Sequence, residues 1–328
     1  MQPFKYTRAT DAAGATRAVA ANKDARFLGG GTNLLDLMRE GVDKPGELVD
    51  ITGLNLGQIR SVDGGISIGA LAKNTDTANH PLVRQNYPML TQAILAGASA
   101  QIRNMATNGG NLLQRTRCSY FYDVSMPCNK REPGSGCGAM EGINRNHAVF
   151  GWSDKCIAVH PSDMCVALVA LDAVVKVQDA DGKERSIPFA DFHRLPGDTP
   201  EADNNLKQGE LITAIQLPKS NIATNSYYLK IRDRASYAFA LVSVAAGLNM
   251  RDKVVTEARI AMGGVAHKPW RAMEAEKFLR GKSATDENFK AAAEAEMKSA
   301  KTFEHNRFKV ELGKRAIVHA LRRAAKSA

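Results

Sequence analysis

The chain has 328 residues, of which 44% are hydrophobic and 24% are charged, a composition ordinary for a soluble globular protein. No apolar run approaches the roughly 18 residues of a membrane-spanning helix, and the first residues lack the apolar segment of a secretory signal. Lys and Arg exceed Asp and Glu, 44 to 34, which gives a formal net charge of +10. Because no zinc-finger spacing or RNA-binding aromatic motif accompanies this charge, we expect a solvated or partner-facing surface and no nucleic-acid partner.

The first hundred residues alternate between helical and strand patterns, which predicts an α/β arrangement. Helices are expected at 10–22 and 34–40, with strands at 26–28 and 48–51. A β-hairpin is predicted at 59–62 and 66–68, because Asp63-Gly64-Gly65 between apolar runs favours a tight turn. The segment 88–98 is predicted to form a buried helix, with Leu90, Ile94 and Leu95 facing inward.

The rest of the chain divides into an irregular region and a second patterned region. Residues 114–156 are rich in Gly, Pro, Asn and Arg without a period, which indicates an inserted, functional loop. Strand patterns resume at 173–177 and 211–217, and 221–225 is a candidate linker. Strands at 239–249 and 254–262, followed by helices at 269–280, 286–300 and 304–325, predict a separate α+β domain.

Two glycine-rich segments are candidate phosphate-binding loops. Gly29-Gly30-Gly31-Thr32-Asn33 lies between a short strand and a helix, and Thr107-Asn108-Gly109-Gly110-Asn111-Leu112 has the same character. Glycine lets the backbone approach a ligand, and a helix start presents free N–H groups to phosphate. Each segment could equally be only a tight connection. Neither matches G-x-G-x-x-G, and the formal match at 134–139 has no strand before it.

The five cysteines, which all fall within 48 consecutive residues, require an explanation of their own. The spacing is C-x9-C-x8-C-x18-C for Cys118, Cys128, Cys137 and Cys156, followed by Cys165. Zinc ribbons pair their ligands at C-x2–4-C, which is absent here. Four thiolates from a Gly-rich loop suit a [4Fe–4S] cluster. The spacing alone leaves a cluster, zinc, and free or paired thiols open.

The two glycine motifs resemble a pair of sequence motifs from a known protein family. Residues 29–38 (GGGTNLLDLM) and 101–113 (QIRNMATNGGNLL) resemble the two FAD-binding signatures in flavoprotein subunits of molybdenum hydroxylases, the family of xanthine dehydrogenase, carbon monoxide dehydrogenase and aldehyde oxidoreductases. Pro161-Ser162-Asp163 and the segment from Lys230 to Ala238 resemble its flavin-proximal segments, with Ser236 where the family usually has an acidic residue.

This resemblance implies a fold and a set of binding residues. The fold is α+β: a two-lobed FAD-binding domain of the p-cresol methylhydroxylase/vanillyl-alcohol oxidase type at 1–220, with lobes of about 1–55 and 56–220, and then a CO dehydrogenase flavoprotein-like α+β domain at 226–328. Asp163 and Lys230 would lie near the flavin ring, and Tyr237 would pack on its face unless it belongs to a core strand. The pyrophosphate and ADP side would be held by Arg26, Phe27, Leu28, Gly29, Gly30, Gly31, Thr32, Asn33, Leu34, Thr107, Gly109, Gly110 and Asn111.

The cysteine region carries a narrower resemblance. It is similar to an insertion in a minority of these flavoproteins, most closely in the bacterial periplasmic aldehyde oxidoreductases. This similarity implies a [4Fe–4S] cluster on Cys118, Cys128, Cys137 and Cys156. Cys165 lies in an apolar run and is expected in the core. His147 and His160 are not expected to be ligands, and His160 is expected to position the turn before Asp163.

No Ser/His/Asp or paired-carboxylate constellation is present, so we expect no catalytic residue and place the chemistry on cofactors. The resemblance implies an electron-transfer subunit of a heterotrimeric aldehyde oxidoreductase. A large molybdenum-cofactor subunit would oxidise the aldehyde, and a small subunit with two [2Fe–2S] clusters would pass electrons to FAD and an external acceptor. The alternatives are the medium subunit of an aroyl-CoA reductase, or a zinc- or nucleic-acid-binding module. The expected location is the periplasm, by co-export with a twin-arginine-signal partner, with the cytoplasm as the alternative.

Overall fold

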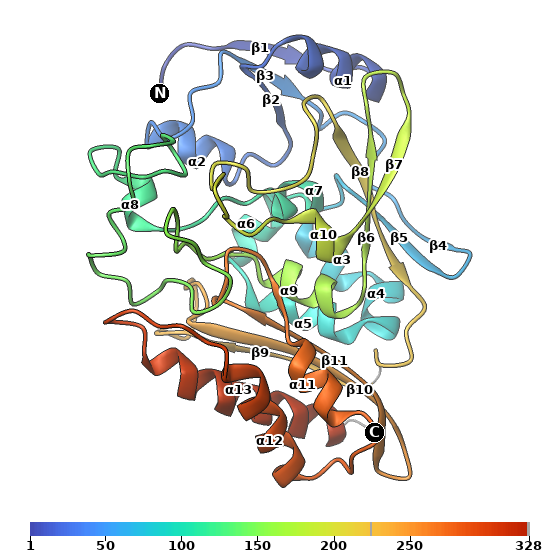
Figure 1. Ribbon diagram of the computed structural model, residues 1–328. Helices are drawn as coiled ribbons and strands as arrows, with labels where there is room; N and C mark the ends of the chain where they lie inside the picture. The colour runs from blue at the N-terminus through green and yellow to red at the C-terminus, as the bar shows by residue number, and fades with distance from the viewer. Residues whose placement is uncertain (224, 327–328) are drawn as a thin grey trace.

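The computed structural model describes residues 1–223 and 225–326. It contains three sheets in chain order, stacked from the blue N-terminal end to the red C-terminal end in Figure 1. Residue 224 of the candidate linker lies outside the described residues. Ile222 and Ala223 of that segment are buried in the core, so this part is not an exposed linker. In the described part of the chain, no helix is long and apolar enough to cross a membrane.

The first sheet is parallel and small. Its order is β1 (Lys5–Arg8), β3 (Glu47–Asp50) and β2 (Ala25–Leu28), with α1 (Ala12–Ala21) and α2 (Leu34–Arg39) as connections. The Asp11 carboxylate caps α1 by accepting from Gly14 N at 2.7 Å. The first glycine loop follows the carboxyl end of β2 and precedes α2, as predicted.

The second sheet is antiparallel, in the order β4 (Ile59–Val62), β5 (Gly65–Gly69), β8 (Leu211–Pro218), β6 (Val174–Gln178) and β7 (Glu184–Pro188). The predicted hairpin is confirmed as β4 and β5. The helices around this sheet are α3 (Asn74–Asn79), α4 (Pro81–Asn86), α5 (Pro88–Ala96), α6 (Ala100–Met105), α7 (Asn108–Leu112), α9 (Asp163–Ala170) and α10 (Phe189–Phe192).

Two of these helices form the centre of the molecule. Every residue of α9 is buried, which includes Cys165, and this confirms its predicted core position. The expectation for α5 is confirmed for Leu90 and Ile94 but is wrong for Leu95, whose exposure is 44%. Leu95 lies one residue before the end of α5, where the chain turns toward the surface.

The third sheet is antiparallel, in the order β12 (Trp270–Arg271), β11 (Val254–Gly263), β10 (Val242–Arg251) and β9 (Ser226–Ile231). The helices α11 (Met273–Leu279) and α13 (Phe308–Lys326) pack on it, and α12 (Asp286–Met297) packs against both of them, while α5 and α9 lie on its side toward the second sheet (Figure 1). The strand predicted at 239–249 begins only at Val242, because residues 237–241 border a cleft instead.

The cysteine region is irregular, as predicted, and contains the single-turn helix α8 (Ser119–Tyr122). Its far end is held by the C-terminal domain. Lys301 N donates to Val149 O at 2.9 Å, and the buried Lys309 ammonium donates to His147 O at 2.9 Å and Gly264 O at 2.7 Å. The loop is therefore fixed by contacts with residues that lie about 150 positions later in the chain.

Candidate cofactor sites

The two glycine segments lie in direct contact. A Cβ atom added at Gly30 would lie 2.1 Å from Met105 O, and one added at Gly29 would lie 2.9 Å from Thr107 Oγ1. The Thr107 hydroxyl also accepts from Gly110 N at 3.2 Å, which caps α7. The segments can approach this closely only because positions 29 and 30 have no side chain.

Replacing Gly30 with alanine is expected to separate the two segments. Its methyl group would overlap the Met105 carbonyl, and such overpacking is typically unfavourable by about 1–3 kcal/mol. If this strain is relieved by movement of the loops, FAD affinity falls about tenfold or more. Flavin content after dialysis measures the effect. Gly57→Ala is the control, because a Cβ there would lie 3.8 Å from its nearest neighbour. Full flavin retention in Gly30→Ala would contradict the predicted role of this contact.

A cleft of about 610 Å³ opens beside these loops, a size typical of cofactor sites. Six of the sixteen predicted FAD-binding residues line it: Thr32, Gly110, Asn111, Asp163, Lys230 and Tyr237. The other ten do not border it: Arg26, Phe27, Leu28, Gly29, Gly30, Gly31, Asn33, Leu34, Thr107 and Gly109. Five further polar lining residues lie within the flavin motifs but were not among the predicted binding residues: Asp36, Arg103, Ser162, Asp233 and Arg234. Four lie outside these motifs, in separate parts of the chain, so none of the motifs could identify them: Asn74, Gln114, Arg117 and Asn146.

A buried ion pair forms the floor of the cleft. Lys230 Nζ lies 2.8 Å from Asp163 Oδ2, and the two side chains are only 4% and 7% exposed. The Tyr228 hydroxyl donates to Asp163 Oδ1 at 2.6 Å, and burial together with the Asp163 charge raises the pKa of Tyr228 well above its usual value. Asp163 also begins α9, where the helix dipole favours a carboxylate.

One buried polar atom near the first glycine loop has no protein partner among the described residues. Asn33 Oδ1 accepts from Arg115 N at 2.9 Å, but Asn33 Nδ2 is enclosed without an acceptor. Buried donors are nearly always paired, so this amide suits a ligand oxygen. Together with the glycine contact, it indicates that the cradle fits an oxygen-rich group such as a pyrophosphate.

Tyr237 lies at the mouth of the cleft. Its backbone is left-handed (φ 50°), a strained conformation for a residue with a side chain, and its exposure is 58%. The Arg234 guanidinium lies 5.7 Å from the ring centroid. Of the two alternatives for Tyr237, the core strand is wrong, because β10 begins five residues later.

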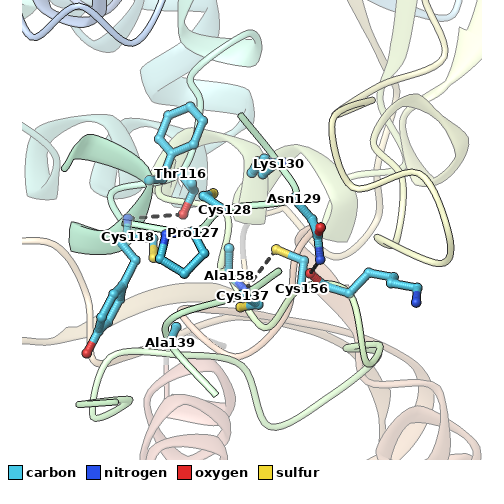
Figure 2. A pocket seen from close by; sticks show the side chains of 13 residues that line it. Thr116, Cys118, Pro127, Cys128, Asn129, Lys130, Cys137, Ala139, Cys156 and Ala158 are labelled. Atoms are coloured by element: carbon cyan, nitrogen blue, oxygen red, sulfur yellow. Dashed lines mark hydrogen bonds between the residues drawn. The ribbon is translucent and has the colours of Figure 1, made fainter. Parts of the chain in front are cut away.

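The four predicted cluster cysteines border a second, small cavity. Figure 2 shows the sulfur atoms of Cys118, Cys128, Cys137 and Cys156 around one space, and Cys165 is not among its lining residues. Cys128 and Cys137 are also paired through an isolated β-bridge. No disulfide joins any of the five cysteines, all of which the structure describes.

Burial determines the protonation of these thiols. Burial raises the pKa of Cys118 to about 12 and that of Cys156 to about 11, and it also raises the pKa of Cys137. Buried thiols without a cation therefore stay neutral, whereas a metal converts them to thiolates. Four converging thiols with no bond among them match the donor set of a thiolate-bound metal centre.

The cleft and the cysteine cavity are lined by neighbouring residues of the chain. Arg117 lines the cleft and the next residue, Cys118, lines the cavity. Asn146 likewise lines the cleft, and His147 Nε2 lies 3.2 Å from Cys118 Sγ. The segments 117–118 and 146–147 therefore contact both spaces.

A separate group, His160, Cys165 and His193, has its potential ligand atoms within 4.8 Å of one another. His160 Nδ1 accepts from Ser162 N at 3.3 Å, so its other nitrogen carries the proton of the neutral ring. His193 Nε2 lies 2.8 Å from Leu112 O and donates to it. This tautomer leaves His160 no free lone pair for a metal. The prediction that His160 positions the turn before Asp163 is confirmed.

Buried histidines predict that stability falls in mild acid. Burial lowers the pKa of His193 and His267 to about 4 and holds that of His160 well below its usual value. In the unfolded chain these histidines become protonated near pH 6.5. Above pH 6.5 they therefore do not lower the free energy of unfolding. Between pH 6.5 and pH 4 the free energy of unfolding decreases as the pH falls, by up to about 1.4 kcal/mol per pH unit for each histidine. Denaturant unfolding between pH 7 and pH 5 measures the slope. His193→Gln should reduce it, and an unchanged slope would contradict this assignment.

Comparison with known proteins decides the family. Residues 2–220 match the FAD binding domain in molybdopterin dehydrogenase, and residues 227–328 match the CO dehydrogenase flavoprotein C-terminal domain. The chain belongs to the FAD-binding subunit family of the molybdopterin dehydrogenases. FAD is therefore its cofactor, and it is a subunit of an oxidoreductase. The predicted fold class is confirmed.

Individual relatives match over nearly the whole chain. The chain is 49% identical over 325 residues to the aldehyde oxidoreductase FAD-binding subunit PaoB of Escherichia coli, with 99% of each chain covered. It is 30% identical over 291 residues to the glyceraldehyde dehydrogenase medium chain of Sulfolobus acidocaldarius. This match covers 88% of this chain and 85% of the relative. Carbon monoxide dehydrogenase from Hydrogenophaga pseudoflava shares the fold, with a TM-score of 0.78, 24% identity and 100% of both chains covered.

Proposed function

We propose that this chain is the electron-transfer subunit of a molybdenum-dependent aldehyde oxidoreductase and carries a [4Fe–4S] cluster in addition to FAD. The substrate class is supported by the two relatives named for aldehyde oxidation, one of them 49% identical over almost the full length. The cluster is supported by the convergence of Cys118, Cys128, Cys137 and Cys156 on one cavity. This convergence is the observation that carries the proposal.

In this proposal, partner subunits oxidise the substrate and this chain transfers the electrons. A partner subunit with the molybdenum cofactor converts aldehyde and water to carboxylic acid, releasing two electrons and two protons. A small partner with two [2Fe–2S] clusters passes the electrons on, so that the three chains form a heterotrimer. FAD accepts electrons singly and releases them singly or in pairs, and an iron–sulfur cluster carries one electron at a time.

The residues of this chain then have positioning roles. The glycine segments and the Asn33 amide hold the pyrophosphate side of FAD. Asp163 and Lys230 present one hydrogen-bonding ion pair to the flavin end of the cleft. Tyr237 and Phe239, which are 58% and 50% exposed, border its mouth and limit access of the external acceptor. The neighbouring lining residues Arg117 and Cys118 support electron exchange between the two cofactors.

Reduction of the flavin by an aldehyde tests this proposal. In the anaerobically purified complex, benzaldehyde should bleach the flavin absorbance, and an added acceptor should restore it. The isolated chain with FAD is the control and should stay oxidised, because the aldehyde is oxidised on another subunit. A complex whose flavin is reduced by another electron donor but not by any of several aldehydes would contradict the proposal.

The proposed location is the periplasm, reached by export of the folded complex through a partner's twin-arginine signal. Its support is the resemblance of the cysteine region to that of periplasmic aldehyde oxidoreductases. Fractionation of cells that produce all three subunits tests it. Recovery of the complex from the cytoplasm alone would contradict it.

A further inference from the structure

A buried lysine lies beside the cysteine cavity. Lys130 comes two residues after Cys128, lines the cavity, and has a side chain that is 1% exposed. Its ammonium contacts the Asp203 carboxylate, donates to Pro200 O at 2.8 Å, and lies 2.7 Å from His267 Nε2. These three acceptors match the three hydrogens of an ammonium group.

The surrounding groups leave one net positive charge. Asp203 is shared, because Arg115 Nε donates to its second oxygen at 2.8 Å. His267 Nδ1 lies 2.8 Å from Arg194 O and donates to it, so Nε2 accepts from Lys130 and the ring is neutral. Although burial opposes it, the charges of Lys130 and Arg115 hold the pKa of Asp203 well below its usual range. Two cations therefore share one anion, and Lys130 is the more deeply buried of the two cations.

This charge acts on the cavity. Lys130 lines this cavity together with the four cysteines, and its enclosed ammonium is held in place by three acceptors. Its charge therefore favours negative charge in the cavity through the low-dielectric interior. A cluster bound by four thiolates is anionic and gains a further negative charge on reduction, so a nearby buried cation favours the reduced form.

We propose that Lys130 is a positioning residue whose fixed charge raises the reduction potential of the cluster, and that Asp203 moderates this effect. The inference rests on the proposed [4Fe–4S] cluster. The Lys130–Asp203 ion pair then has an electrostatic role as well as a structural one.

A second lysine at the same cavity provides a matched control. Lys155 also lines the cavity, but its side chain is 46% exposed and its nearest ion partner, Asp154, lies at 3.5 Å. Solvent screens an exposed charge far more than a buried one. The two lysines line the same cavity and differ in the exposure of their charges.

The test is a redox titration of the complex, followed by electron paramagnetic resonance, for the wild type, Lys130→Met, Asp203→Asn and Lys155→Met. In Lys130→Met, the equilibrium constant for cluster reduction should fall about tenfold, which for one electron is about 59 mV in the negative direction. Asp203→Asn should shift the potential in the positive direction, because Lys130 and Arg115 then lose their counter-charge. Lys155→Met should leave the potential unchanged.

The outcomes separate this inference from the proposed function. The electrostatic role is overturned if Lys130→Met keeps its iron and its cluster potential does not shift. It is also overturned if the cluster potential shifts in the same direction in Lys130→Met and Asp203→Asn. If Lys130→Met loses its iron, the cluster potential of Asp203→Asn tests the electrostatic role instead. A positive shift of that potential supports the role, and no shift or a negative shift overturns it. A wild-type complex without iron beyond two [2Fe–2S] clusters overturns the proposed cluster itself, and this inference with it.

Discussion

Replacing Cys128 with alanine is expected to remove the iron of the proposed [4Fe–4S] cluster while most FAD stays bound. Cys128 is buried and borders the cavity with the other three thiols, so its loss leaves three ligands for a cluster that normally takes four. The cleft keeps its lining, because Cys128 is not part of it. Iron and flavin analysis of the purified complex measures both quantities.

Cys165→Ala is the matched control for this substitution. Cys165 is also a buried free thiol, but it belongs to α9 and does not border the cysteine cavity. Its variant should keep the full iron content. A Cys128→Ala complex with wild-type iron, or equal loss in both variants, would contradict the assignment of the four ligands.

Replacing Lys230 with methionine is expected to destabilise the protein by about 3–5 kcal/mol, because it leaves the Asp163 carboxylate buried without its ion partner. FAD binding should weaken as well, since the pair forms the floor of the cleft. Denaturant unfolding and flavin content measure these effects. Arg232→Met is the control: Arg232 also donates to Ala96 O, at 3.1 Å, and forms no ion pair within the described residues.

The double variant Asp163→Asn/Lys230→Met tests the physical reason. Removing both charges relieves the unpaired carboxylate, so the double variant should lose less stability than the two single variants added together. Strict additivity would mean that the 2.8 Å contact contributes nothing beyond the separate side chains.

The local parts of both sites could be predicted from the sequence. Glycine runs flanked by Thr and Asn mark the tight loops around 29–33 and 107–111, since a close backbone approach requires residues without side chains. The clustered cysteines, in a segment without a period, marked the second site. The helix predicted at 304–325, which is α13, and the Asp-Gly-Gly hairpin could equally be predicted, because their signals are local.

The long-range parts could not be predicted. Asp203 pairs with Arg115, 88 positions earlier, and no periodicity connects them. The cleft lining from α5 to the 237–241 segment depends on how two domains pack. Lys130 stood in a loop rich in charges, and only the fold shows that its side chain is enclosed.

The most direct test of the two-cofactor account is the visible spectrum, with iron and flavin content, of the complex purified anaerobically with its native partners. We expect flavin bands together with iron in excess of the four atoms that two [2Fe–2S] clusters supply. Flavin with no such excess would contradict the cluster, and a complex without flavin would contradict the assignment of the cleft.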